Sequence, residues 1–242
     1  MSISLPLHPS FHRHRHSLAH VRGLPALACN RLIGFVASSM VGFFLPIFLY
    51  EFFHASLSLV IAWYALELVV KFPFFVWAAK IYSHTGLLVS MIVGPLGTML
   101  FYWAFFLLDA GSSFHPYVLM GTGIFGLAVV SAFYWSPFHI DLAQMTVQHR
   151  RGRKIAVFYA IERVLGVLAP VLAGFVIVAY GYKINFLLAL IITAASIIPL
   201  FFLPHFHVAY EFGFVETFRK LFSRRFRGMA LSMMAFGAEN VV

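Results

Sequence analysis

Two pairs of charged residues lie inside long apolar stretches of the sequence, where ionised side chains are rare. Glu67 and Lys71 occupy the middle of the apolar segment 55–79, and Glu162 and Arg163 lie in the first third of the segment 155–180. An ionised side chain at the centre of a membrane helix costs about 2.5–3.5 kcal/mol on the insertion scale, so such residues usually pair or serve a function. All four are therefore candidates for binding a substrate or a coupling ion.

The two pairs differ in their expected geometry. Glu67 and Lys71 are four residues apart, which puts both on one helical face, with the glutamate amino-terminal to the lysine in the favourable order. They form either a self-neutralising structural pair or a contact on a substrate pathway. Glu162 and Arg163 are adjacent and point about 100° apart on a helix, so we expect each to find a partner on another helix or to extend to the nearby interface.

The composition requires a membrane around these charges. Hydrophobic residues make up 62% of the 242-residue chain and charged residues only 10%, with a mean hydropathy of +0.90. Soluble domains are about half apolar and about a quarter charged, so the lipid bilayer must solvate much of this chain. Six segments are long enough to cross it as helices, namely 32–50, 55–79, 87–108, 116–138, 155–180 and 184–203. The sequence predicts an all-α membrane protein, because a spanning helix satisfies its own backbone groups.

The positive charges indicate the orientation. With the amino terminus inside, 14 of the 17 lysines and arginines fall in cytoplasmic segments, and only Lys183 falls outside. The positive-inside rule therefore predicts a cytoplasmic amino terminus, and we expect a cytoplasmic membrane of the bacterial type. The net charge of +9 is explained by this loop asymmetry and does not indicate a nucleic-acid partner.

The chain divides into four predicted parts. Residues 1–31 form a basic, histidine-rich cytoplasmic tail, 32–203 a six-helix bundle and 204–228 a basic cytoplasmic loop. Residues 229–242 read as the start of a seventh helix, which is too short to cross and so suggests a truncated chain. The alternative for this last part is a tail that lies on the membrane surface.

Signatures of catalysis, cofactors and metals are not found. The sequence contains no His-Glu-x-x-His motif, no Gly-x-Ser-x-Gly elbow and no phosphate-binding loop, so we expect no enzyme and no cofactor. The histidines between His12 and His16 alternate with arginines and lack acidic or cysteine partners, which favours a solvated basic tail over a metal site. Cys29 is the single cysteine, so no internal disulfide forms.

Two segments resemble the major facilitator superfamily of secondary transporters. The basic run Arg150-Arg151-Gly152-Arg153-Lys154 resembles the loop that joins helices 4 and 5 in that family. The following Ala169-Pro170-Val171-Leu172-Ala173-Gly174 is similar to its Gly-Pro-x-x-Gly-Gly signature, with alanine in two glycine positions. The small residues Gly166, Ala169, Ala173 and Gly174 predict close packing of the fifth span against a neighbouring helix.

The resemblance implies the amino-terminal half of a transporter that moves a small solute by alternating access. It also implies a partner, either a second six-helix half or a second copy of the chain. The loop between the second and third spans departs from the family pattern, with Ser83 and Leu87 where an aspartate and an arginine are usual. The fourth span lacks the basic residue of proton-coupled members, so proton antiport by the usual route is not expected. The alternative is a membrane scaffold or assembly subunit that does not transport, marked by Glu67 and Lys71 buried against each other without a polar groove.

Overall fold

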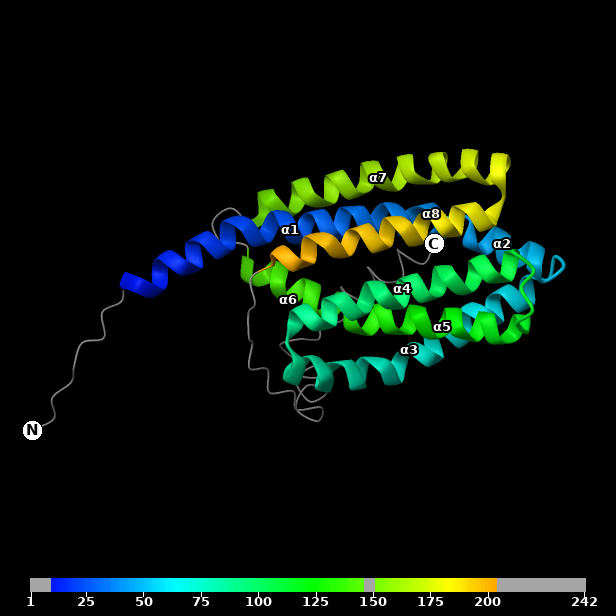
Figure 1. The fold of residues 1–242 in the computed structure, drawn as a ribbon, viewed down its shortest axis with the longest axis horizontal. Helices are drawn as coiled ribbons and strands as arrows, with labels where there is room; N and C mark the ends of the chain where they lie inside the picture. Colours follow the sequence, from blue (N-terminus) through cyan, green and yellow to red (C-terminus); the bar gives the residue numbers. More distant parts are fainter. Residues whose placement is uncertain (1–9, 146–150, 204–242) are drawn as a thin grey trace, which may run out of the picture. The chain divides into compact units, whose positions relative to one another are not determined.

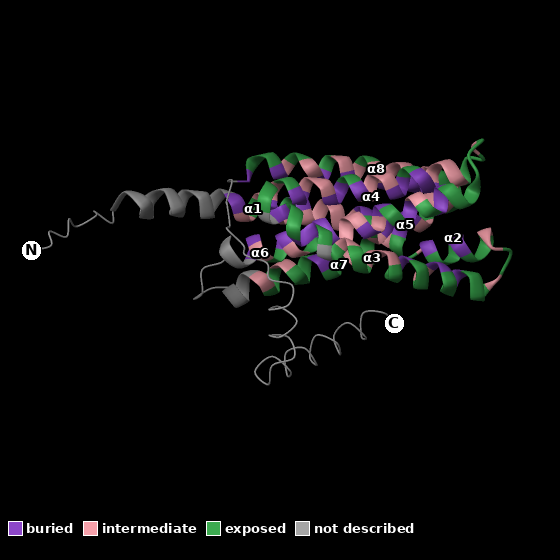
Figure 2. Ribbon diagram, turned by 90° about the horizontal axis from the view of Figure 1, so that it is seen from below, coloured by how far each residue is buried: buried purple, intermediate pink, exposed green. Residues whose placement is uncertain are grey.

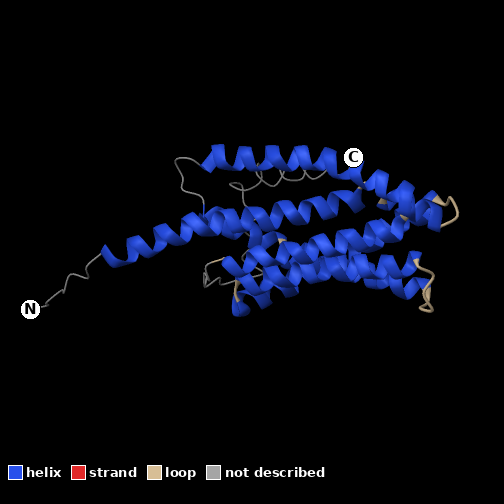
Figure 3. Ribbon diagram, turned by 45° about the horizontal axis from the view of Figure 1, so that its top comes forward, coloured by secondary structure: helices blue, strands red, loops and turns tan. Residues whose placement is uncertain are grey.

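A computed structural model describes residues 10–145 and 151–203, which form helices and no strand (Figure 3). In chain order the α-helices are α1 (Ser10–Gly42), α2 (Leu45–Phe52), α3 (Leu57–Thr85), α4 (Leu87–Asp109), α5 (Pro116–Phe133), α6 (Trp135–Met145), α7 (Arg151–Tyr180) and α8 (Tyr182–Ile197). A 3-10 helix, η2 (Ile198–Phe202), continues α8. The all-α prediction is confirmed.

The six predicted spans are confirmed, and the largest shift is at the start of the first. Among the described residues, six helices are long and apolar enough to cross a membrane, namely Gly23–Phe52, Leu57–Tyr82, Leu87–Asp109, Pro116–Leu142, Ile155–Tyr180 and Tyr182–Phe202. The first begins before residue 32, and α1 already begins at Ser10. The predicted boundary follows Arg31, because a charge usually marks the end of a span. In the structure that charge has a partner inside the bundle. The predicted segments 204–228 and 229–242 lie outside the described residues, and the four-part division of the chain stays a prediction.

The bundle has two central pairs of helices and two flanking helices (Figure 1). α4 packs against α5 and α8, and α1 packs against α8, while α7 contacts α1 on one side and α3 contacts α5 on the other. Buried residues concentrate in the central helices (Figure 2): 44% of the most apolar window is buried in the span that begins at Leu87, but only 18% in α3 and 17% in α7. The outer faces of α3 and α7 are thus apolar surfaces.

Proline interrupts the fourth span, and a polar side chain compensates for the interruption. Pro137 cannot donate a backbone hydrogen bond to the carbonyl of Phe133, and the helix breaks between α5 and α6. The hydroxyl of Ser90 on α4 donates to that carbonyl at 2.7 Å. Because lipid offers no substitute donor, this side-chain bond allows the break to exist inside the bundle.

A similar contact supports the break between α1 and α2. The N–H of Phe44 bonds to the carbonyl of Val41 instead of continuing the α-helical pattern to Met40. The side-chain amide of Asn185 on α8 donates to the Met40 carbonyl at 3.3 Å, and Asn185 is 1% exposed. This buried amide ties α8 to the irregular point of the first span.

Glycine permits the closest approach in the bundle, between α4 and α5. A Cβ added at Gly97 would lie 2.7 Å from the carbonyl oxygen of Gly126, and a Cβ at Gly126 would collide with the carbonyl oxygen of Gly97. Only hydrogen fits at both positions, because the obstacle on each side is backbone and cannot rotate away.

The small residues of the fifth span face a neighbouring helix, as predicted. Ala169 and Ala173 on α7 are 2% and 0% exposed and pack with Met40 of α1. A Cβ added at Gly166 or Gly174 would lie 3.4 Å from the nearest phenylalanine ring of the first span. α7 thus packs against the first span along a stripe of small residues.

Candidate functional site

A cavity of about 220 Å³ opens among the central helices. Its walls come from α1, the start of α2, α4, α5, the start of α6 and α8. The apolar walls include Val41, Leu45, Pro95, Phe101, Leu127 and Val130, and the polar lining comprises Asn30, Arg31, Ser38, Thr98, Tyr134, Trp135, Thr193 and Ser196. A cavity of this size, mostly apolar with a few polar groups, suits a small organic ligand.

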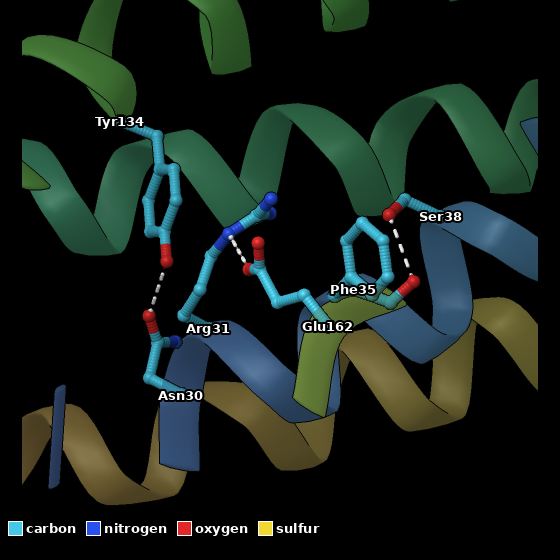
Figure 4. Close-up of polar contacts among 6 residues, drawn as sticks. All are labelled: Asn30, Arg31, Phe35, Ser38, Tyr134 and Glu162. Carbon is cyan, nitrogen blue, oxygen red and sulfur yellow. Dashed lines mark hydrogen bonds and ion pairs between the residues drawn. The ribbon is translucent and has the colours of Figure 1, made fainter. Parts of the chain in front are cut away.

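One wall of the cavity carries a charge that the sequence analysis assigned to the tail. The Nε of Arg31 lies 2.6 Å from Oε1 of Glu162 on α7, and the two side chains are 13% and 7% exposed (Figure 4). Oε1 receives no well-aligned hydrogen bond from the described residues, so the contact is held by charge more than by hydrogen-bond geometry. The expectation that Glu162 finds a partner on another helix is confirmed.

Aromatic rings cover the guanidinium group of Arg31. Its central carbon lies 4.5 Å from the ring centroid of Trp135 and 5.0 Å from that of Phe35. Both distances allow cation–π attraction, which strengthens away from water. The rings fix the plane of the guanidinium group beside the cavity.

A buried hydrogen-bond chain fixes the backbone next to Arg31. The hydroxyl of Tyr134 donates to Oδ1 of Asn30 at 2.7 Å (Figure 4), and Nδ2 of Asn30 donates to the carbonyl of Ser196 at 2.7 Å. Asn30 and Ser196 are each 1% exposed. The chain links α1, the α5–α6 junction and α8, so Arg31 projects from a rigid point.

These residues form one layer across the bundle. Arg31, Trp135, Glu162 and Ser196 each lie six to eight residues from the same end of their spans, the end at which Gly23 lies. At 1.5 Å per residue this depth is about 10 Å inside the span. The ion pair is therefore well below the interface, where an uncompensated charge is costly.

Glu67 and Lys71 form the ion pair that their spacing predicts. Nζ of Lys71 lies 2.5 Å from Oε1 of Glu67, with side-chain exposures of 21% and 9%. Both belong to α3, the flanking helix that packs on α5, and neither lines the 220 Å³ cavity. The structure thus separates this pair from Glu162, which belongs to the other flanking helix.

Arg163 has a different position from its neighbour Glu162. It is exposed on α7 and forms no ion pair with a described residue. None of the cavity-lining residues, Arg31 and Thr193 included, is among the four site residues predicted from the sequence. Glu162 has no lysine or arginine on its own helical face. This feature of the sequence indicates that its partner is a cation on another helix.

The described part of the chain holds no group of three or more histidine, cysteine, aspartate or glutamate side chains that could bind a metal ion. The six apolar spans found among the described residues define a multi-span membrane protein. A family model described as Major Facilitator Superfamily matches residues 27–241. The chain therefore belongs to the Major Facilitator Superfamily.

Membership supports a role as a secondary transporter in general, and transporters of this superfamily are generally not enzymes. Comparison with curated proteins gave no match. Comparison with solved structures also gave none.

Proposed function

We propose that this chain is one half of a secondary transporter that moves a small solute by alternating access and that the 220 Å³ cavity is its substrate site. The observation that carries the proposal is that Arg31, which is paired with Glu162 inside the bundle, lines that cavity. Intramembrane charges that border a cavity commonly mark substrate or ion pathways. Membership in a superfamily of secondary transporters supports transport as the function.

The proposal includes a partner for the flanking helices. α3 and α7 expose large apolar side chains such as Leu68, Phe72, Val167 and Phe175. Lipid covers part of this surface, and we propose that a second six-helix half or a second copy of the chain covers the rest and completes the transport path. The amino terminus is proposed to be cytoplasmic, in a membrane of the bacterial cytoplasmic type, from the distribution of basic residues.

Transport is tested by filling the cavity. Ser38 is exposed and lines the cavity, so Ser38→Trp occupies the space without disturbing the core, and Ser58→Trp makes the same change at an exposed position of α3. The protein is reconstituted in liposomes, and uptake of a panel of labelled solutes is measured under imposed proton and sodium gradients. We expect saturable uptake that Ser38→Trp abolishes and Ser58→Trp retains. Equal uptake by both variants would exclude the cavity as the substrate site.

A non-transporting scaffold is the second candidate, favoured by one observation. Glu67 and Lys71 neutralise each other on a single helix, away from the cavity, as expected of a structural pair. The cavity with its polar lining argues against a purely structural bundle. Well-folded protein that takes up no solute under either gradient would favour the scaffold.

A further inference from the structure

Arg31 lines the cavity with more N–H donors than its ion pair with Glu162 uses. A guanidinium group carries five N–H donors, and the ion pair is formed at Nε, 2.6 Å from Oε1 of Glu162. Trp135 and Phe35 cover the group, so its planar edge is held in a fixed orientation beside the cavity. Two parallel N–H groups on a fixed plane match a carboxylate in bidentate geometry.

A second unused donor lines the same cavity. Thr193 on α8 is 3% exposed, and its hydroxyl has no hydrogen-bond partner within the described residues. It lies one helical turn from Ser196, whose carbonyl is bonded by the neighbour of Arg31 in the chain, Asn30. A buried hydroxyl without a partner costs about 1–3 kcal/mol, and a ligand that bonds it removes that cost.

We infer that Arg31 binds the carboxylate of a small monoanion with an apolar body, and that Glu162 is the internal carboxylate that limits this binding. The inference rests on the proposed function, in which the cavity is the substrate site. Arg31 is the only cation among the cavity-lining residues that the structure describes, so the site offers one cation to one carboxylate, in competition with Glu162. The apolar walls suit a hydrocarbon body, and the volume of about 220 Å³ limits its size.

Glu162 opposes the ligand in two ways. It occupies one edge of the guanidinium group, and its own charge repels a second anion at a site largely removed from water. Replacing Glu162 by glutamine keeps the size of the side chain and removes the charge. Anion binding should then tighten, and a bound anion should also stabilise the variant, because Arg31 is otherwise left uncompensated.

The test uses radiolabelled benzoate in equilibrium dialysis against the purified protein in detergent, with benzamide and inorganic phosphate as competitors. We expect Glu162→Gln to bind benzoate at least tenfold more tightly than the wild type and to gain more thermal stability from it. Arg31→Lys keeps the positive charge but loses the planar pair of parallel N–H donors, so it should bind benzoate at least tenfold more weakly than the wild type. Glu51→Gln, the same change as Glu162→Gln at an exposed position of α2, should leave the affinity unchanged.

A double variant removes the charge of Arg31 without leaving Glu162 unpaired. Arg31→Gln combined with Glu162→Gln removes both charges, leaves neither unpaired, and should not bind benzoate. Benzoate binding by this double variant, no tighter binding by Glu162→Gln, or equal competition by benzamide would each overturn the inference. Absence of benzoate binding in both wild type and Glu162→Gln would overturn it as well.

The outcomes separate this inference from the proposed function. Dialysis requires no transport, so benzoate binding without uptake of any solute would refute transport and leave the anion site standing. Uptake of a neutral or cationic solute that Ser38→Trp blocks, without benzoate binding, would refute the anion site and leave transport standing.

Discussion

Removing one partner of the Glu67–Lys71 pair should destabilise the bundle, whereas removing both charges together should not. The side chains are 9% and 21% exposed, so each single change leaves a largely desolvated charge on α3. Breaking a buried ion pair lowers the free energy of unfolding by about 3–5 kcal/mol. Because Lys71 is partly exposed, we expect the lower end of this range, about 3 kcal/mol. That loss corresponds to more than a hundredfold change in the unfolding equilibrium.

Unfolding titrations with SDS in mixed micelles measure this difference. Glu67→Gln and Lys71→Met should each lose about 3 kcal/mol, and the two changes together should return to within about 1 kcal/mol of the wild type, because a neutral pair has no charge to compensate. Glu51→Gln, an exposed acid on α2, provides the control, with a change of less than about 0.5 kcal/mol. A Lys71→Met variant as stable as the double variant would show that Lys71 does not compensate Glu67, and would refute the reasoning.

The same double variant separates a structural role from a functional one. If the pair is structural, protein with both changes folds and transports as the wild type does in liposomes. If Glu67 contacts the substrate or a coupling ion, the double variant folds normally but loses uptake. The position of both residues outside the cavity lining favours retained uptake.

Three other outcomes are expected. Cysteine labelling should report Ser113 outside and Gln148 inside, and reversed accessibility would contradict the proposed orientation. Gly126→Leu should prevent folding in detergent, because the backbone of α4 fills the space, whereas Gly121→Leu should fold normally, since nothing lies within 4 Å of a Cβ there; size-exclusion chromatography distinguishes them. Ser90→Ala should lower the free energy of unfolding by about 1–3 kcal/mol, because it leaves the carbonyl at the α5–α6 break without a donor, and SDS titration measures the loss.

The six spans could be predicted because length and hydropathy alone determine them. A run of about 20 apolar residues has no other stable environment, and the bilayer then requires a helix. The pairing of Glu67 with Lys71 was also predictable, since both charges lie four residues apart on one helix.

The Arg31–Glu162 pair could not be predicted in the same way. The pair joins the first span to the fifth. A span predicted from hydropathy ends at a charged residue unless the partner of that charge is known. The spacing predicts a partner for Glu162 on another helix but does not say which residue that is, and the adjacent Arg163 lies on the exposed side of α7. Long-range pairing depends on how the helices are arranged, and sequence spacing does not contain that information.

The described contacts distinguish helices that are linked by side-chain hydrogen bonds from α7, which packs through apolar contacts and one ion pair. Side-chain hydrogen bonds from Asn30, Ser90 and Asn185 link α1, α4, the α5–α6 junction and α8 at the points where helices break. Among the described side chains of α7, Glu162 is the residue that forms an ion pair with these helices, and the other contacts are apolar along a stripe of small residues. Small apolar surfaces can slide past each other without leaving polar groups unsatisfied. A carboxylate ligand that competes with Glu162 for Arg31 would therefore weaken the ion pair that holds α7 in its present position.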